Sequence, residues 1–298
     1  MKFIDKKSIV VICAVLLLSG CGNPENTENI AETKTSKIDT NRSKINKVNL
    51  AQLALSEGKT PLEYLEDEFN KKRPSSFVLE DQKVFDPWSD ANRSLIHFSK
   101  DNWTSQFDFT GVAWNSIKAG TLVTNQHILV AAHFARAVGE EVRFYTKEGK
   151  EVVRTIVALK TLEQYDNRIS DSCIEKLNAP VPNSIKVYSI INAEGLDDFS
   201  SLNGSPLILT DQRRKAYVDV IPSFNGTALL MNFAKYNKVS TLMYHKIIGG
   251  DSGGPIFSVV DGELVIVALV NHYTSGDFLA YDPIYNALVQ AIADMENK

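Results

Sequence analysis

The sequence has few cysteines: Cys13, Cys21 and Cys173 are the only ones among 298 residues. The first two lie within and directly after an N-terminal apolar stretch, so Cys173 has no disulfide partner in the body of the chain. A disulfide framework is therefore excluded, and the fold must depend on its hydrophobic core. The five histidines show no spacing typical of metal sites, and we expect neither a metal nor another cofactor.

Strong net charge and long apolar runs are also missing. The formal net charge is -4, with 44% hydrophobic and 23% charged residues, which is ordinary for a soluble globular protein. This balance gives no electrostatic basis for a nucleic-acid partner. The apolar run Ile9–Leu18 is too short to span a bilayer. Because Lys2, Lys6 and Lys7 precede it, the segment is typical of a secretory signal peptide.

The apolar run ends in Leu18-Ser19-Gly20-Cys21, which resembles the lipoprotein box of bacterial signal peptides. The resemblance implies that residues 1–20 are removed and that Cys21 is lipidated; an ordinary signal peptide with an incidental cysteine is the alternative. We expect a cell-envelope protein, held by lipid to a bacterial membrane and facing the periplasm or exterior. Residues 21–49 are polar, without aromatics after Asn23, and are expected to form a flexible tether.

Residues 50–89 carry a helical pattern. Apolar residues recur at partly helical spacing over Leu50–Lys72, with a break near Gly58. This predicts two short helices, the second capped by Thr60 ahead of Pro61. We expect a short helical segment before the main domain.

Residues 90–298 consist of short β-runs separated by turns and followed by one helix. Many short strands at near-regular spacing predict an all-β sandwich or barrel. The predicted strands are 120–130, a hairpin over 142–159, 205–209, 216–221, 239–244, 254–259 and 264–270, and the predicted helix is 283–295.

The segment Gly250-Asp251-Ser252-Gly253-Gly254-Pro255 has the composition of a catalytic turn. A serine hydroxyl needs a base within hydrogen-bond reach, a third group to orient that base, and donors aimed at the oxyanion. Glycines let backbone N–H groups converge on one point. His133 follows an apolar run and two alanines, and Asp171 precedes a further apolar segment, so both are candidates for the remaining roles.

Three segments together resemble the trypsin/chymotrypsin family of serine proteases: "VAAHF" with His133, "DSCIEKLNAPV" with Asp171, and "GGDSGGP" with Ser252. Their order is that of chymotrypsin. The resemblance covers about 90–298 and implies two antiparallel six-stranded β-barrels with a C-terminal helix. It implies that Ser252 is the nucleophile, His133 the base and then acid, and Asp171 the orienting group. The backbone N–H groups of Gly250 and Ser252 would form the oxyanion hole.

Asp171 has an alternative in Asp166, because Ser172 and Glu175 stand where the family prefers aliphatic residues. The apolar residues after position 173 favour Asp171. Cys173 itself is expected to be a small buried residue. In animal relatives the equivalent of Asp251 pairs with an N-terminus made by proteolysis, and no convincing start of that kind occurs here; the question of activation stays open.

The resemblance places Lys246 at the floor of the specificity pocket and His272 in one wall. A basic floor would suit an acidic substrate side chain, whereas a Lys246 that points to solvent would not. The chain is thus expected to be a serine endopeptidase whose partners are protein or peptide substrates and, through its lipid, a membrane. A non-catalytic surface-binding lipoprotein and an esterase on the same scaffold are the alternatives.

Overall fold

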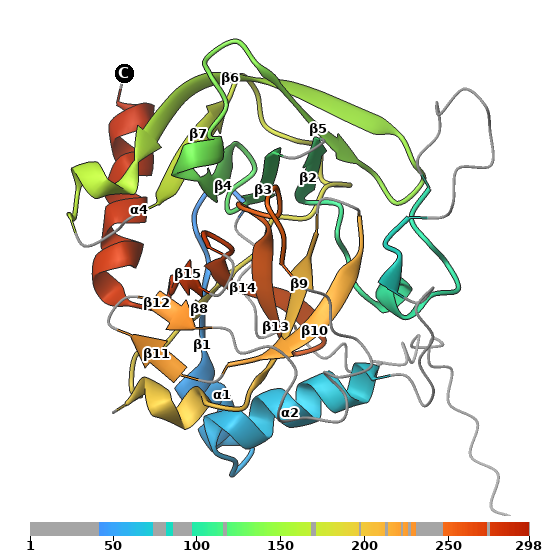
Figure 1. The fold of residues 1–298 in the computed structure, drawn as a ribbon, viewed down its shortest axis with the longest axis vertical. Coiled ribbons are helices and arrows are strands. Elements are labelled where there is room, and N and C mark those ends of the chain that lie inside the picture. The colour runs from blue at the N-terminus through green and yellow to red at the C-terminus, as the bar shows by residue number, and fades with distance from the viewer. Residues whose placement is uncertain are drawn as a thin grey trace, which may run out of the picture. The chain divides into compact units, whose positions relative to one another are not determined.

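The computed structural model describes residues 42–73, 82–85, 97–115, 118–167, 171–196, 198–211, 214–221, 223–225, 228–230, 247–272 and 275–297. Strands dominate, in two six-stranded sheets and one three-stranded sheet, and a helix lies near the C-terminus (Figure 1). The expected mostly-β fold with a C-terminal helix is therefore confirmed. In these ranges no helix is long and apolar enough to cross a membrane.

The first sheet has the order β2-β3-β4-β7-β6-β5, and all its neighbouring strands are antiparallel. Its end strands β2 and β5 contact each other, so the sheet nearly closes into a barrel. Its interior is apolar and includes Cys173, whose pKa burial raises to about 12, as expected of a small buried residue. The strands are β2 (Val112–Asn115), β3 (Lys118–Leu122), β4 (His127–Ala131), β5 (Glu141–Tyr145), β6 (Glu151–Thr161) and β7 (Ser172–Leu177).

One strand prediction in this sheet is wrong, because 120–130 is two strands rather than one. Residues 123–126 form a turn between β3 and β4, and the Thr124 hydroxyl stabilises it. That hydroxyl oxygen accepts the Gln126 N–H at 3.1 Å and lies 2.8 Å from His127 Nδ1. The hairpin predicted over 142–159 is confirmed as β5 and β6.

The second sheet has the order β1-β8-β14-β13-β9-β10. Strands β14, β13, β9 and β10 are antiparallel, but β8 runs parallel to both β1 and β14, so the expected wholly antiparallel sheet is not observed. The first strand comes from residues 47–49, at the end of the expected tether, where Val48 is buried. The strands are β1 (Lys47–Asn49), β8 (Ile190–Asn192), β9 (Pro206–Thr210), β10 (Ala216–Val220), β13 (Pro255–Val260) and β14 (Glu263–Leu269).

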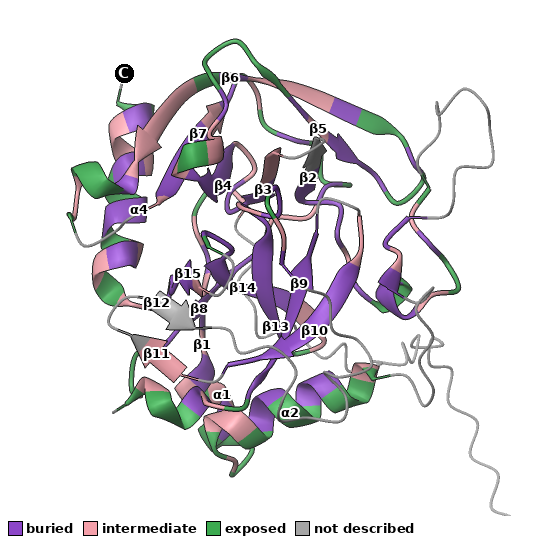
Figure 2. Ribbon diagram, viewed as in Figure 1, coloured by how far each residue is buried: buried purple, intermediate pink, exposed green. Residues whose placement is uncertain are grey.

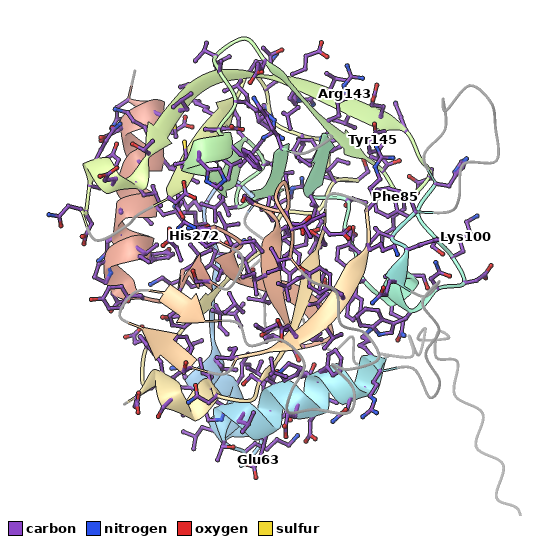
Figure 3. All side chains as sticks on the ribbon, in the orientation of Figure 1. Glu63, Phe85, Lys100, Arg143, Tyr145 and His272 are labelled. Carbon is purple, nitrogen blue, oxygen red and sulfur yellow. The ribbon has the colours of Figure 1, made fainter. Side chains whose placement is uncertain are left out.

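Two helices, α1 (Leu50–Ser56) and α2 (Pro61–Lys72), follow β1. They are the two short helices predicted over Leu50–Lys72. The Thr60 hydroxyl oxygen caps α2 by accepting the Glu63 N–H, and the carboxylate of Glu63 (labelled in Figure 3) accepts the Thr60 N–H in return. The buried face of α2 includes Tyr64 and Leu65 and packs against β13 and β9 (Figure 2). Because these side chains are buried, the helix is part of the core. Each fully buried apolar side chain contributes about 1.5–3 kcal/mol to the stability of the fold.

Helix α4 (Asp282–Glu296) follows the last strand of the chain but packs against β6 and β7 of the first sheet. Lys176 Nζ donates to the Met295 carbonyl at 2.9 Å, and the Tyr165 hydroxyl donates to Asp294 at 2.8 Å. The C-terminal helix is thereby attached to the first sheet, although the strand before it in the chain belongs to the small sheet. The third sheet is small and consists of β11 (Ser223–Asn225), β12 (Ala228–Leu230) and β15 (Ser275–Asp277). The described residues also form 3₁₀ helices at Trp103–Gln106, Ala132–Phe134, Leu162–Gln164 and Phe199–Leu202.

Candidate active site

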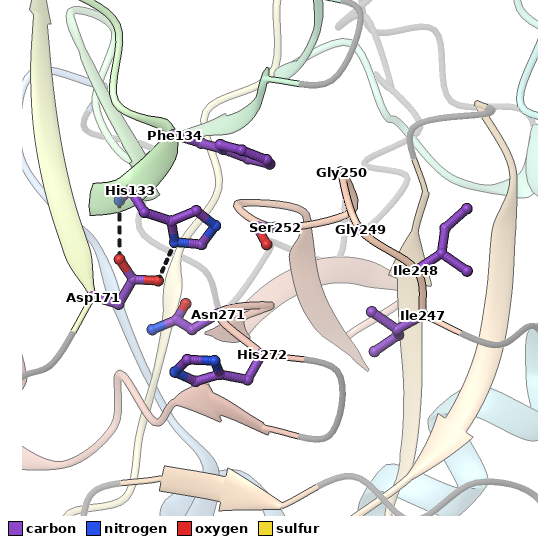
Figure 4. A pocket seen from close by; sticks show the side chains of 10 residues that line it. All are labelled: His133, Phe134, Asp171, Ile247, Ile248, Gly249, Gly250, Ser252, Asn271 and His272. Carbon is purple, nitrogen blue, oxygen red and sulfur yellow. Dashed lines mark hydrogen bonds and ion pairs between the residues drawn. The ribbon is translucent and has the colours of Figure 1, made fainter.

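The three predicted catalytic side chains meet in one pocket of about 500 Å³ (Figure 4). His133 lies in the 3₁₀ helix that follows β4 and Asp171 directly precedes β7, both strands of the first sheet, whereas Ser252 lies in the loop before β13 of the second sheet. The pocket therefore lies between the two sheets. It is lined by His133, Phe134, Asp171, Ile247, Ile248, Gly249, Gly250, Ser252, Asn271 and His272.

His133 is fixed by Asp171 through both its backbone and its ring. The carboxylate accepts the His133 N–H at Oδ1 (3.0 Å), and Oδ2 lies 2.5 Å from Nδ1. The Ala132 N–H also donates to the Asp171 carbonyl at 2.8 Å, which joins the two segments by their backbones. A carboxylate beside Nδ1 selects the tautomer with the proton on that nitrogen and leaves the Nε2 lone pair available. Asp171, and not the alternative Asp166, is thus the partner of His133.

The two side chains differ in exposure, as their predicted roles require. The His133 side chain is 43% exposed, whereas that of Asp171 is 12% exposed. Ser252 lies on the side of the imidazole away from Asp171 (Figure 4). No hydrogen bond joins Ser252 to His133, two residues that the structure describes; such bonds often tighten only when substrate binds.

The loop around Ser252 is held by its own hydrogen bonds. The Asp251 N–H donates to the Ile248 carbonyl at 3.1 Å, and the buried Asp251 carboxylate accepts the Ile248 N–H at 2.8 Å. Gly253 has a φ of +80°, and a Cβ there would lie 2.9 Å from the Ala119 carbonyl oxygen of β3. Only glycine can adopt this conformation so close to the first sheet.

Two backbone N–H groups of the loop have no acceptor within the described ranges: those of Gly250 and Ser252. Their neighbours are engaged, since Gly253 donates to the Val270 carbonyl at 2.7 Å and Gly254 to that of Asp251 at 3.0 Å. Gly250 has a φ of +103°, which places it in the left-handed region. Unengaged donors beside a nucleophile are what an oxyanion hole requires, and these are the two residues predicted for it.

Only one of the two residues predicted for specificity lies in the described part of the chain. His272 is exposed and lines the pocket that holds Ser252, whereas Lys246 and Cys21, the residue predicted to be lipidated, lie outside the described residues. Asn271 was not predicted. It is 4% exposed, and its side-chain amide has no hydrogen-bond partner within the described part of the chain.

Sequence reasoning also missed two buried polar residues, Arg136 and Asp277, because nothing in the local pattern marks them. Ser172 and Glu175 were noticed only as mismatches with the family pattern. Ser172 is bound to Asp277, and Glu175 to Arg136, and in each pair the two residues lie far apart in the sequence.

The described residues contain no group of three or more His, Cys, Asp or Glu side chains that could hold a metal ion. His127 lies in the core, where burial lowers its pKa to about 4 and Thr124 occupies its Nδ1. It is 3% exposed and is not among the residues that line the pocket.

No family model matches the chain, and no curated protein is similar enough in sequence to match it. Its function must therefore be inferred from the chemistry and geometry of the pocket.

Proposed function

We propose that the chain is a serine endopeptidase that hydrolyses peptide bonds through an acyl-enzyme. The observation that carries the proposal is the 2.5 Å contact between His133 Nδ1 and the Asp171 carboxylate in the pocket that also holds Ser252. The two unengaged N–H groups of Gly250 and Ser252 add the donors that the reaction needs. A pure binding protein has no use for this combination.

In the proposed reaction, Ser252 Oγ attacks the carbonyl carbon of the scissile bond while His133 Nε2 takes the hydroxyl proton. Asp171 stabilises the resulting imidazolium, and the oxyanion accepts hydrogen bonds from the Gly250 and Ser252 N–H groups. The C–N bond then breaks as Nε2 gives its proton to the leaving amine. Water repeats the sequence on the acyl-enzyme and restores the serine.

The same proposal takes the fold to be the chymotrypsin-like pair of β-barrels. The nearly closed first sheet and the pocket between two six-stranded sheets support it. The parallel strands β1 and β8 are a departure from that pattern. They extend the second sheet on the side of β14, away from the β9–β13 pair, and so leave the Ser252 loop unaffected.

Labelling with a fluorophosphonate tests the function directly. We expect the purified mature protein to be labelled at one site, mapped by mass spectrometry to Ser252, and the Ser252→Ala variant to be unlabelled. Ser201→Ala, which changes an exposed serine outside the pocket, is the matched control and should be labelled like the wild type. Labelling of Ser252→Ala at the wild-type level would show that the nucleophile is another residue. Turnover of casein against a nitrophenyl ester then separates an endopeptidase from an esterase.

We also propose that Cys21 carries a lipid anchor, because it follows a short apolar run that cannot span a bilayer. In cells, Cys21→Ser should move the protein from the membrane pellet to the soluble fraction. A Cys173→Ser variant, which changes the buried cysteine, should stay in the pellet. Equal pelleting of both variants would argue against the anchor.

A further inference from the structure

A second buried carboxylate lies behind Asp171. Asp277, the last residue of β15, is 3% exposed, and its Oδ2 accepts the Ser172 hydroxyl at 2.6 Å. Ser172 is 1% exposed and directly follows Asp171 at the start of β7. The residue that directly follows the partner of His133 is therefore bound to this carboxylate.

This carboxylate joins parts of the molecule that are remote in sequence. Ser172 belongs to the first sheet, whereas Asp277 ends a strand of the small sheet, 105 residues later. That strand is in turn bound to the pocket wall, since the N–H groups of Asn271 and His272 donate to the Ser275 carbonyl at 3.2 and 3.0 Å. Asp277 thus ties the position of Asp171 to the wall of the same pocket.

Burial raises the pKa of Asp277, the hydrogen bond that the Ser172 hydroxyl donates lowers it, and the charge of Asp171 raises it. Asp171 is the charged group that faces it from the start of β7; Ser172 and Asn271 face it as neutral groups. An ionised carboxylate accepts a hydroxyl proton more strongly than the oxygen of an amide or of a carboxylic acid does.

We propose that Asp277 is a positioning residue for the catalytic pair. Through Ser172 it fixes the segment that carries Asp171, the residue that orients His133, and when ionised its carboxylate favours the imidazolium that forms during the reaction. The inference rests on the proposed function of the pocket. It assigns Asp277 no contact with substrate.

The variant Asp277→Asn keeps the shape but removes the charge and turns an NH₂ group toward the donors. We expect the pKa of His133, followed by NMR titration of its imidazole, to fall by about half a unit or more. We expect kcat to fall about tenfold or more, with KM nearly unchanged, because misplacement of a catalytic group slows chemistry more than binding. A merely structural role would lower the melting temperature without shifting the His133 titration.

Asp219→Asn is the matched control, because Asp219 is also buried, 1% exposed, but lies on β10 outside the pocket. Its Oδ1 accepts the Val220 N–H at 2.8 Å, and burial raises its pKa to about 7. This variant should leave the His133 titration and kcat at wild-type values. Equal behaviour of the two variants would overturn the proposal.

If Asp277→Asn does not fold, Ser172→Ala removes one donor and leaves the carboxylate in place. Its kcat should fall about three- to tenfold at a temperature well below its melting temperature. Ser258→Ala, which changes an equally buried serine on β13, should keep the wild-type kcat. No difference between these two variants would also overturn the proposal.

The NMR titration separates this proposal from that of the protease. A wild type that is neither labelled nor active would contradict the protease, yet the His133 titrations of Asp277→Asn and Asp219→Asn would still decide the role of Asp277. An active wild type with identical titrations in both variants would contradict the role of Asp277 alone.

Discussion

Replacing Asp171 by Asn is expected to lower kcat by about 10⁴-fold while leaving the fold intact. The Asp171 carboxylate accepts both the His133 backbone N–H and the Nδ1–H, at 3.0 and 2.5 Å. The asparagine oxygen can still accept the backbone N–H, but its NH₂ group then faces Nδ1. Nδ1 must then act as an acceptor, so the ring proton moves to Nε2. With Nε2 protonated, the ring can no longer take the proton of Ser252. Stopped-flow measurement of acylation, with circular dichroism to verify folding, tests this.

Asp166→Asn is the matched control, since Asp166 is the other aspartate that the sequence leaves open for this role. Because the His133 ring is bound to Asp171, the control should retain wild-type kcat and acylation rate. Loss of activity in the Asp166 variant alone would transfer the orienting role to that residue. A loss of less than about tenfold in Asp171→Asn would show that His133 holds its tautomer by other means.

The features that could be predicted from the sequence are local ones. The β5–β6 hairpin follows from a polar turn between two apolar runs, and α2 follows from Thr60 ahead of Pro61. The Ser252 loop could be predicted because its glycines lie within a few residues of each other and allow backbone conformations that other residues rarely adopt. Turn 123–126 was missed because the residues on both sides of it are apolar, which makes two strands look like one.

Pairings between distant segments could not be predicted. Strand β1 comes from a polar segment and is held by a parallel partner, β8, that no local pattern identifies. The Ser172–Asp277 bond escaped notice for the same reason, since each residue alone is an ordinary polar residue. Glu175 shows the problem most clearly. It lies next to apolar Ile174 in β7, and its burial is explained only when its partner is known.

That partner is Arg136, and breaking their pair is expected to have the largest effect on stability. Glu175 and Arg136 side chains are 0% and 1% exposed. Arg136 Nη1 donates to Glu175 Oε2 at 3.1 Å, the Arg136 backbone N–H donates to Oε1, and Nη2 donates to the Lys118 carbonyl. Burial raises the pKa of Glu175, and the guanidinium and hydrogen bonds of Arg136 oppose that rise. The carboxylate is therefore the main counter-charge of a buried cation.

Glu175→Gln leaves the guanidinium buried without that counter-charge and should lower the free energy of unfolding by about 3–5 kcal/mol. The measurement is urea denaturation at neutral pH. Arg143→Met is the control, because Arg143 (labelled in Figure 3) pairs with Glu141 and Glu151 on β5 and β6, and the three side chains are 43%, 55% and 40% exposed. An exposed pair contributes at most about 1 kcal/mol. Equal losses in both variants would mean that water reaches the Arg136 guanidinium.

The double variant Arg136→Met with Glu175→Gln separates the charge from the packing. The glutamine oxygen can still accept the backbone N–H of residue 136, and neither side chain of the former pair carries a charge. Because a buried ion pair gains little over neutral groups of similar volume, the double variant should recover most of the stability lost in Glu175→Gln. Arg136 lies three residues after His133, and Glu175 four after Asp171. If the double variant regains stability but not kcat, the pair also fixes the geometry of the two catalytic segments, which a neutral core does not reproduce.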